Sequence, residues 1–187
     1  MLSRVEKLVE QYKKLVGLPW ERNIAGPQRV WFVVYDKTDE RKLRYHQDEF
    51  ETATTNAGRK WREVDLTNAF AEWLGKHEYR DGYFEDPSEV ERALPEFQHT
   101  VVERIEAEFK AGDENTVVAL RGVASLFGLI SVSDVVQTAE DSVRGRLLVF
   151  FPGEYENKHY WFLGDRGRSG WNYLAVPITA HEIGETP

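Results

Sequence analysis

The sequence predicts an α/β fold in which a mostly parallel sheet is flanked by helices, as a Rossmann-like three-layer sandwich. Short apolar runs alternate with stretches of helical periodicity through most of the chain, an order typical of strand–helix–strand units. The run "RVWFVVYD" (29–36) is apolar at consecutive positions, as expected for a strand buried on both faces. With 187 residues, 41% of them hydrophobic, the chain is long enough for one domain with a real core.

Residues 3–16 are expected to form an N-terminal amphipathic helix. Ser3 and Glu6 match the capping-box pattern, and Gly17 is a typical stop signal. Apolar residues recur on one stripe at helical spacing: Val5, Leu8, Val9, Tyr12, Leu15 and Val16. This stripe packs either on the same domain or on a partner. We divide the chain into a helix and linker (1–26), an α/β domain (27–180) and a tail (181–187).

The middle of the chain is expected to hold one further strand between helices. "KTDERKLRYHQDEFETATTNAG" has helical character, and "WREVDL" (61–66) predicts the second strand. Thr67 is the expected cap of a helix over "NAFAEWLGKH". Asp86, followed by Pro87, begins a long amphipathic helix. Because Pro95 lies inside that pattern, a kink or two abutting helices are expected there.

The C-terminal part is expected to supply the remaining strands. "NTVVALRGVASLFGLI" predicts a strand and a glycine-punctuated turn, after which Ser131 or Ser133 caps a helix over "DVVQTAEDSV". "RLLVFF" and "WNYLAVPI" predict the last two strands. Between them, "PGEYENKHYWFLGDRGRSG" has the composition of a turn-rich connection.

Composition excludes several classes of site. The chain has no cysteine, which excludes disulfides, thiolate metal sites, Fe–S clusters and a cysteine nucleophile. Its net charge of −8 argues against broad binding to phosphate backbones, which needs a basic face. The N-terminus carries charges throughout, unlike a signal peptide, and no apolar run approaches the roughly 20 residues of a membrane span. We therefore expect a cytoplasmic protein without membrane contact.

The usual nucleotide-binding and catalytic motifs are absent from the sequence. The nearest candidate, "GVASLFG" (122–128), is followed by Leu129 and Ile130, where a P-loop needs Lys and Ser or Thr. There is no G-x-G-x-x-G, no zinc-type histidine pair and no G-x-S-x-G nucleophile motif. We predict no intact P-loop and no cofactor, and we interpret "GVASLFG" as a hydrophobic turn that packs a helix on the sheet.

Two acidic residues remain as weak candidates for a metal site. Asp36 and Asp65 lie at or near the ends of predicted strands, where open α/β sheets bind ligands, and carboxylates suit a divalent cation. A cryptic metal-dependent enzyme is therefore one alternative. Each residue also directly precedes a predicted helix, where Asp is an ordinary cap. We prefer the capping interpretation and assign no catalytic residue.

Aromatic residues are concentrated near the C-terminus. Residues 146–178 hold eight of the chain's 24 aromatic residues, in a segment that includes the turn-rich connection. Aromatic residues together with Arg are typical of interface hot spots, and burial inside the domain accounts for them about equally well. The candidate partner-binding residues are Phe151, Glu154, Tyr155, Tyr160, Trp161, Arg166, Arg168 and Trp171.

Charge is distributed unevenly along the chain. Residues 85–114 carry ten acidic and three basic residues, which form either a solvated helix surface or a face for a basic partner. Arg144, Arg146, Arg166 and Arg168 are a modest basic counterpart near the aromatic segment. A nucleic-acid-contacting module that uses these arginines is a second alternative.

Four segments together resemble one family, the small BrxB-type proteins of BREX bacteriophage-exclusion systems, a domain of unknown function. They are "RVWFVVYD", "WREVDLTNAFAEWLGKHEYRDGYFEDP", "VVALRGVASLFGLISVSDVV" and "RGRLLVFFPGEYENKHYWFLGDRGRSGWNYLAVPIT". The similarity covers roughly residues 20–180, and "RGRLLVFFPGEYEN" followed by "GWNYLAVPI" is its most specific part. The loop "KHYWFLGDRGRS" departs from the family pattern, which is shorter and more polar there.

The resemblance implies a role rather than a reaction. BREX operons encode a DNA adenine methyltransferase, a PglZ-type protein of the alkaline phosphatase superfamily, a large ATPase and small accessory proteins. BrxB-like members are needed for defence or host methylation and have no established catalytic residues. The resemblance therefore implies a non-catalytic adaptor that binds the PglZ-type protein. It also implies the methyltransferase and the ATPase as further expected partners, with only indirect contact to DNA.

Overall fold

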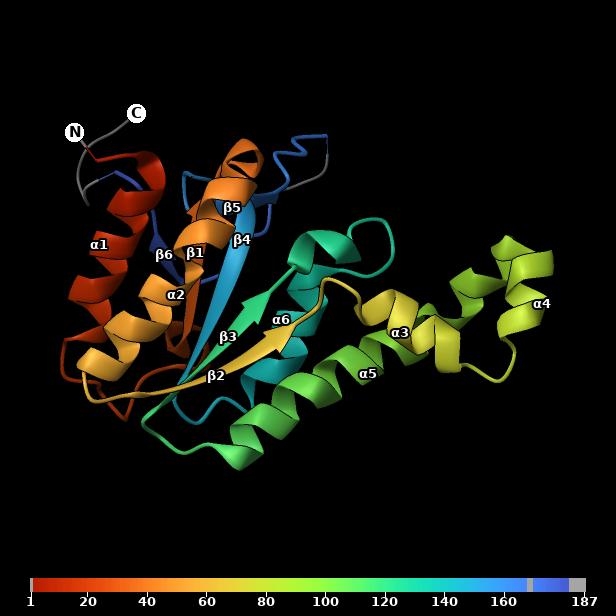
Figure 1. Ribbon diagram of the computed structural model, residues 1–187, viewed down its shortest axis with the longest axis horizontal. Helices are drawn as coiled ribbons and strands as arrows, with labels where there is room; N and C mark the ends of the chain where they lie inside the picture. The colour runs from red at the N-terminus through yellow and green to blue at the C-terminus, as the bar shows by residue number, and fades with distance from the viewer. Residues whose placement is uncertain (1, 168–169, 182–187) are drawn as a thin grey trace.

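The computed structural model describes residues 2–167 and 170–181, and its centre is a mostly parallel sheet (Figure 1). The strands in this part of the chain are β1 (Val30–Tyr35), β2 (Lys60–Asp65), β3 (Thr116–Arg121), β4 (Arg146–Glu156), β5 (His159–Phe162) and β6 (Val176–Ile178). Their order is β2-β3-β4-β1-β6, with all of these neighbours parallel, and β5 pairs antiparallel with β4.

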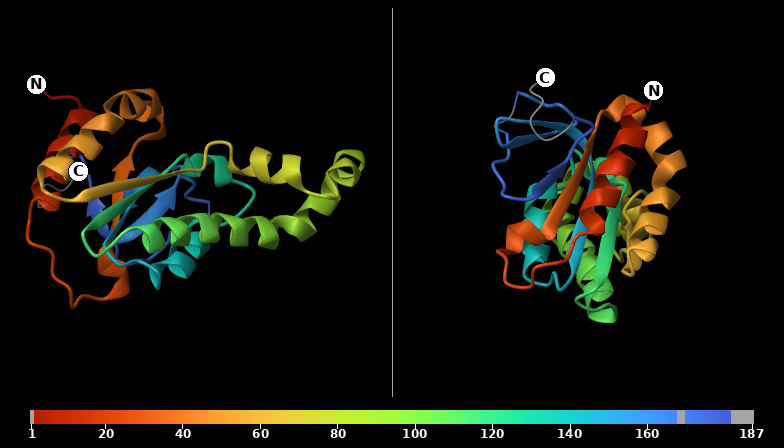
Figure 2. Two further views of the ribbon diagram at one scale, coloured as in Figure 1. Left: turned by 60° about the horizontal axis from the view of Figure 1, so that its bottom comes forward. Right: turned by 90° about the vertical axis from the view of Figure 1, so that its left-hand side faces the viewer.

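Helices cover both faces of the sheet, as Figure 2 shows. One face carries α1 (Arg4–Val16) and α2 (Glu40–Asn56), and the other carries α5 (Val90–Ala111) and α6 (Val132–Glu140). Helix α3 (Ala69–Lys76) packs on α5. Short 3₁₀ turns lie at Gly26–Arg29, Lys37–Asp39, Pro87–Glu89 and Val123–Leu126. The predicted three-layer α/β fold is confirmed.

Strand β1 shows why the sheet needs two helical layers. All six of its residues are buried, and successive side chains of a strand point to opposite faces. Trp31, Val33 and Tyr35 join the core under α1 and α2, whereas Val30, Phe32 and Val34 join the core under α5 and α6. The prediction from "RVWFVVYD" is therefore confirmed.

Helix α1 is a part of this domain rather than an appendage. Its capping box is present, because Glu6 N donates to Ser3 Oγ (3.3 Å) and Ser3 N donates to Glu6 Oε2 (2.7 Å). Its apolar stripe packs against the sheet and α2, and the buried hydroxyls of Tyr12 and Thr54 are 2.5 Å apart. The stripe thus packs on its own domain. Residues 182–187 of the predicted tail lie outside the described residues.

Several local predictions in the middle of the chain need correction. Asn68, not Thr67, is the N-cap of α3, and Thr67 N donates instead to Asp65 Oδ1 (2.9 Å). A helix that the pattern does not indicate, α4 (Arg80–Glu85), precedes the turn capped by Asp86. At Pro95 the alternative of two abutting helices is wrong, because α5 is one element from Val90 to Ala111 with Pro95 inside it. Pro95 leaves the carbonyl of Glu91 without its helical hydrogen bond, and a kink there stays a prediction.

The largest correction concerns the C-terminal segment. Strand β4 continues past "RLLVFF" to Glu156 and pairs with β5, so most of the expected turn-rich connection is a β-hairpin. By contrast, only Val176–Ile178 of "WNYLAVPI" forms strand β6. Ser131 caps α6 through its side chain, as expected for one of the two candidate serines.

Helices α3 and α4 and the start of α5 extend beyond the edge of the sheet as a helical arm (Figures 1 and 2). The base of this arm is held by the buried ring of Trp73, whose centroid lies 5.5 Å from that of Phe97. Farther out, Tyr79 and Phe84 are 63% and 66% exposed. The arm therefore contributes apolar surface that the domain itself does not cover.

The turn between α5 and β3 contains a carboxylate that makes stability depend on pH. Hydrogen bonds from Lys60, from the Asn115 N–H and from Thr116 lower the pKa of Asp113 from 3.8 to about 2. A carboxyl group with a lowered pKa stabilises the fold above its unfolded-state pKa, and this contribution is lost as pH falls through the folded-state value. We expect Asp113→Asn to be less stable than wild type near pH 6.

The difference between the two proteins should shrink from about pH 4 downwards and disappear near pH 2. Urea unfolding at a series of pH values measures it. A difference that stayed constant across the series would show that the Asp113 charge does not contribute.

Candidate functional site

The hairpin formed by β4 and β5 stands at the carboxyl end of the parallel sheet. Strand β4 pairs with β1 up to Pro152, and from Gly153 onward it pairs antiparallel with β5. The turn residues Asn157 and Lys158 have φ of 51° and 65°, the two positive values that a two-residue type I′ hairpin turn requires. The hairpin places Tyr160 of "GEYENKHYWF" in the core and packs Tyr155 and Phe162 against the core.

A pocket of about 180 Å³ lies beside this hairpin, against the turn before α6 and the start of α6. Its lining residues are Phe127, Gly128, Ile130, Ser131, Val132, Ser133, Phe151, Tyr160, Trp161, Phe162, Asp165 and Trp171. We call it the hairpin pocket. Phe151 and Tyr160 are each only 1% exposed and form its floor, whereas Phe127 is 48% exposed.

The floor of the hairpin pocket is fixed by an aromatic cluster around Phe32. The Phe32 ring lies 5.2 Å from Phe151, 4.7 Å from Tyr160 and 5.4 Å from Trp171, between ring centroids. The Tyr160 hydroxyl donates to the carbonyl of Ala175 (3.0 Å), and burial raises the pKa of Tyr160 above its ordinary value. The floor is therefore buried, closely packed and uncharged.

The rim of the pocket is charged but internally paired. Arg166 Nη2 lies 2.5 Å from Glu154 Oε2 and 2.7 Å from Glu156 Oε2, and its guanidinium sits 4.8 Å from the centre of the Trp161 ring. Hydrogen bonds to Glu154 and then Glu156 raise the pKa of Arg166. This arrangement holds the exposed edge of Trp161 in one position.

The structure brings together seven of the eight predicted partner-binding residues. Trp161, Tyr155 and Trp171 are half-buried, and Glu154 and Arg166 are exposed at the rim. Phe151 and Tyr160 are core residues, so burial within the domain accounts for these two. Arg168 lies outside the described residues.

Sequence reasoning missed the residues that complete the pocket from the other side. Phe127 lies 35 positions before Phe162 in the sequence, and their ring centroids are 5.9 Å apart. In "GVASLFG", Val123 and Leu126 are buried as expected for a packing turn, but Phe127 points outward. The signal available in the sequence was an apolar residue directly before a glycine, Gly128, which has a positive φ in the structure.

Asp36 and Asp65 are not brought together. Their strands, β1 and β2, are separated by β3 and β4, which puts the strand ends three spacings or about 14 Å apart. Asp36 accepts hydrogen bonds from Thr38 N (2.8 Å) and Thr38 Oγ1 (2.6 Å). Among the described residues no group of three or more His, Asp or Glu side chains is placed to hold a metal ion.

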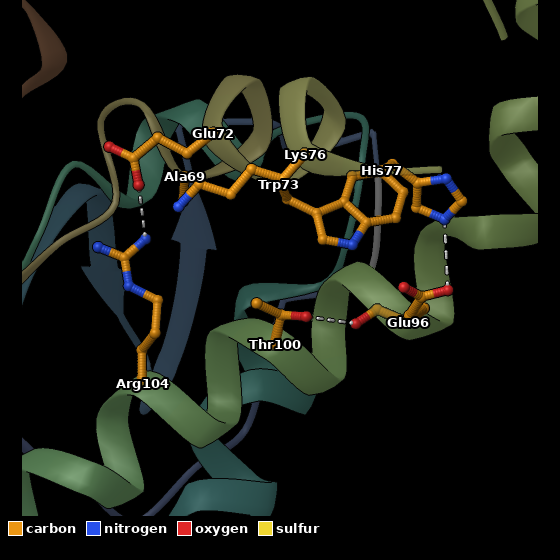
Figure 3. Close-up of a pocket in the computed structure, with 8 residues that line it drawn as sticks. All are labelled: Ala69, Glu72, Trp73, Lys76, His77, Glu96, Thr100 and Arg104. Carbon is orange, nitrogen blue, oxygen red and sulfur yellow. Dashed lines mark hydrogen bonds and ion pairs between the residues drawn. The ribbon is translucent and has the colours of Figure 1, made fainter. Parts of the chain in front are cut away.

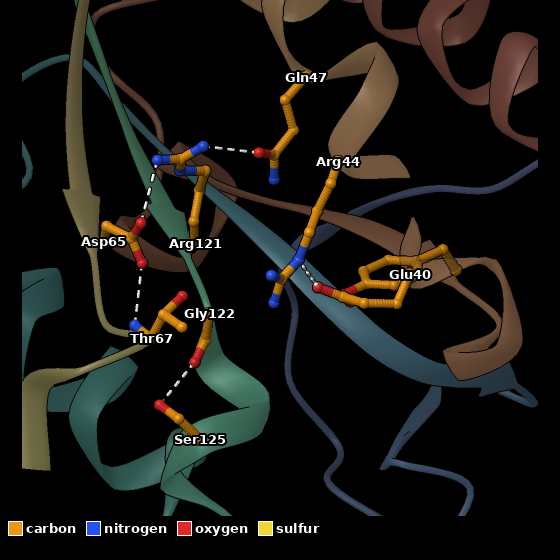
Figure 4. Close-up of polar contacts among 9 residues, drawn as sticks. Glu40, Arg44, Gln47, Asp65, Thr67, Arg121, Gly122 and Ser125 are labelled. Carbon is orange, nitrogen blue, oxygen red and sulfur yellow. Dashed lines mark hydrogen bonds and ion pairs between the residues drawn. The ribbon is translucent and has the colours of Figure 1, made fainter. Parts of the chain in front are cut away.

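Asp65 belongs to a network that ties α2 to the ends of β2 and β3 (Figure 4). Arg121 Nη2 lies 3.0 Å from Asp65 Oδ2 and 2.6 Å from Glu63 Oε1, and Arg121 Nη1 donates to Gln47 Oε1 (2.7 Å). Burial opposes ionisation of Asp65, but hydrogen bonds from Thr67 and the charge of Arg121 lower its pKa overall. These contacts hold α2 against the ends of β2 and β3, which is a structural role.

The described arginines near the aromatic segment, Arg144, Arg146 and Arg166, do not form one basic cluster, and Arg168 lies outside the described residues. Arg146 begins β4, whereas Arg166 pairs with Glu154 near the end of that strand. Eight residues of extended chain separate positions 146 and 154, which is about 26 Å. The combined nucleic-acid surface considered from the sequence is therefore not assembled.

A second recess lies between α3 and α5 (Figure 3) and has a volume of about 450 Å³. Tyr79 N donates to His77 Nδ1 (3.1 Å), and His77 Nε2 lies 3.5 Å from Glu96 Oε2. Across the recess, Arg104 Nη1 is 3.4 Å from Glu72 Oε2. Because polar side chains of α3 and α5 contact each other across it, the recess has the features of a helix–helix contact at the base of the arm.

Comparisons with known proteins give no relationship. The chain matches no family model, no curated protein and no solved structure. Within residues 2–167 and 170–181, no helix combines the length and apolar character that crossing a lipid bilayer requires.

Proposed function

We propose that this protein is a non-catalytic adaptor that binds a partner protein through the hairpin pocket. The observation that carries the proposal is the arrangement of Phe127, Trp161 and Phe162, which lie partly exposed around an apolar recess beside paired charges. An apolar recess with anchored aromatic side chains and a polar rim is the usual composition of an interface hot spot.

The size of the hairpin pocket favours a protein side chain over a small molecule. Its volume of about 180 Å³ is below the roughly 300–1,000 Å³ of typical small-ligand sites. One apolar side chain of a partner fits this space, and the surrounding aromatic edges supply the contact area. Because Phe151 and Tyr160, which form the floor, are already packed in the core, their side chains should lose little conformational entropy when a partner binds.

The proposed identity of the partner depends on the family resemblance. Through the four quoted segments we propose a cytoplasmic BREX complex for anti-phage defence and host DNA methylation, with the PglZ-type protein as the direct partner. The methyltransferase and the ATPase belong to the same proposed assembly, and DNA is reached only through them. The sequence contains none of the usual catalytic motifs considered above, which is consistent with an accessory role.

Size-exclusion chromatography with light scattering tests the proposal, using the chain alone and mixed with the PglZ-type protein of the same genome. We expect co-elution, and a weakening of about tenfold or more in Phe127→Ala and Trp161→Ala, as for hot-spot residues. Phe84→Ala is the matched control, because Phe84 is 66% exposed on the arm.

Two outcomes would overturn this assignment. Separate elution at micromolar concentration would remove the adaptor proposal. If Phe84→Ala lost the complex and Phe127→Ala still formed it, the binding surface would be on the arm rather than at the hairpin.

A further inference from the structure

A basic pocket lies at the amino ends of the parallel strands, whereas the hairpin lies at their carboxyl ends. It has a volume of about 430 Å³ and is formed by the segments that precede β1, β2, β3 and β4. Five arginines line it, namely Arg22, Arg29, Arg59, Arg144 and Arg146, against the acidic residues Glu21, Glu114 and Asp141. This local excess of positive charge occurs in a chain of net charge −8.

Four of these five arginines have no carboxylate within ion-pair distance in the described part of the chain. The exception is Arg22, whose Nη1 lies 3.6 Å from Glu114 Oε2, with side chains 85% and 61% exposed. An exposed pair of this kind neutralises little charge. Arg29 instead donates to the carbonyls of Val143 (2.9 Å) and Arg22 (3.0 Å).

Arg146 is the most unusual member, because it is only 6% exposed. Its Nη1 donates to the carbonyl of Gly145 (2.9 Å) and its Nη2 to that of Glu21 (3.3 Å). Burial, together with the nearby charges of Arg29 and Arg59, lowers the pKa of Arg146 to about 10. Burying a guanidinium without a counter-ion is costly, so a bound anion would relieve a cost that the protein alone leaves in place.

The pocket also has buried hydrogen-bond donors that lack an acceptor, which favours a bound anion. Among the described residues five buried side-chain nitrogen atoms have no acceptor, and three of them belong to this pocket: Trp20 Nε1, Arg59 Nε and Arg146 Nε. The guanidinium groups of Arg59 and Arg146 lie 4.2 Å and 4.6 Å from the centre of the Trp20 ring. All three unmatched groups are donors, and an oxyanion offers only acceptors.

We propose that this pocket binds the phosphoryl group of a small ligand. Planar guanidinium groups match the oxygens of a phosphate in pairs, and the pocket volume lies within the range of small-molecule sites. The site is separate from the partner surface, because it lies at the opposite end of β4. The phosphoryl-binding proposal can therefore be tested independently of the adaptor proposal.

Isothermal titration calorimetry with pyrophosphate at low ionic strength tests the proposal. We expect one site per chain whose affinity falls as salt is added, and which also binds ATP in competition with pyrophosphate. Arg144→Gln changes an exposed pocket residue and should weaken binding about fivefold without affecting the fold. Arg146→Met should abolish binding, and its circular dichroism spectrum reports whether it is folded.

Arg166→Gln is the matched control, since it removes the same charge at the hairpin and should leave pyrophosphate binding unchanged. The proposal is overturned if millimolar pyrophosphate gives no binding, or if Arg166→Gln weakens binding as much as Arg144→Gln. It is also overturned if ATP binds but pyrophosphate does not displace it, because recognition would then not be of the phosphoryl group.

Discussion

Replacing Phe32 by alanine is expected to lower the free energy of unfolding by about 3–5 kcal/mol, the usual cost of removing a fully buried phenylalanine. Phe32 has no exposed surface, and its ring contacts Phe151, Tyr160, Trp171 and Tyr173 at centroid distances of 4.7–6.1 Å. Because these neighbours come from β4, β5 and the segment before β6, they cannot all move inward to fill the cavity.

Urea unfolding, followed by tryptophan fluorescence and by circular dichroism, measures this effect. Phe84→Ala is the control: the same atoms are removed, but Phe84 is 66% exposed, so its effect should stay within about 0.5 kcal/mol. A loss below about 1.5 kcal/mol for Phe32→Ala would contradict the packing around β1. A typical domain has only about 5–15 kcal/mol of stability, so the expected loss is a large share.

The elements with strong local signals were predictable from the sequence. The capping box of Ser3 and Glu6 gave the start of α1, Gly17 gave its end, and the single apolar stripe gave its buried face. The run of consecutive apolar residues in β1 indicated burial on both faces. In each case the residues that decide the structure lie within a few positions of one another.

The hairpin was missed because its local signals point the other way. Pro, Gly and Asn in "PGEYEN" are turn residues, and the hairpin turn uses Asn157 and Lys158 rather than the common Asn-Gly pair. Contacts that the composition does not reveal support it, namely the cross-strand rings of Tyr155 and Tyr160 at 4.6 Å and the backbone bridge from Tyr160 to Trp171. Such contacts cannot be deduced from composition.

The same distinction applies to the two candidate sites. The aromatic segment and its arginines were visible in the sequence, but the contact of Phe127 with Phe162 depends on how the turn Val123–Leu126 packs on β4. The basic pocket collects residues from four separate chain segments, and of its five arginines only Arg144 and Arg146 were singled out from the sequence. Sequence order hides this grouping, whereas a parallel sheet places the amino ends of all its strands along one edge.

Gly153→Ala is expected to cost about 3 kcal/mol, at the upper end of what overpacking usually costs. A Cβ at this position would lie 2.2 Å from the carbonyl oxygen of Trp161 and 2.7 Å from the Phe151 ring. Neither neighbour can yield easily, since one is backbone of the paired strand β5 and the other is 1% exposed in the core. Strand β5 must therefore separate from β4, which displaces Trp161 from the hairpin pocket.

Gly75→Ala provides a control of the opposite sign for the same chemical change. Gly75 lies within α3, and a Cβ there meets nothing within 4 Å, so alanine should stabilise the protein by about 0.5–1 kcal/mol. Urea unfolding of both variants measures the difference. If Gly153→Ala were as stable as wild type, β5 would not pack against β4 as described, and the hairpin pocket would lose its physical basis. If it is destabilised as expected and also fails to bind the partner that Gly75→Ala still binds, then the closely packed hairpin is what presents the aromatic surface.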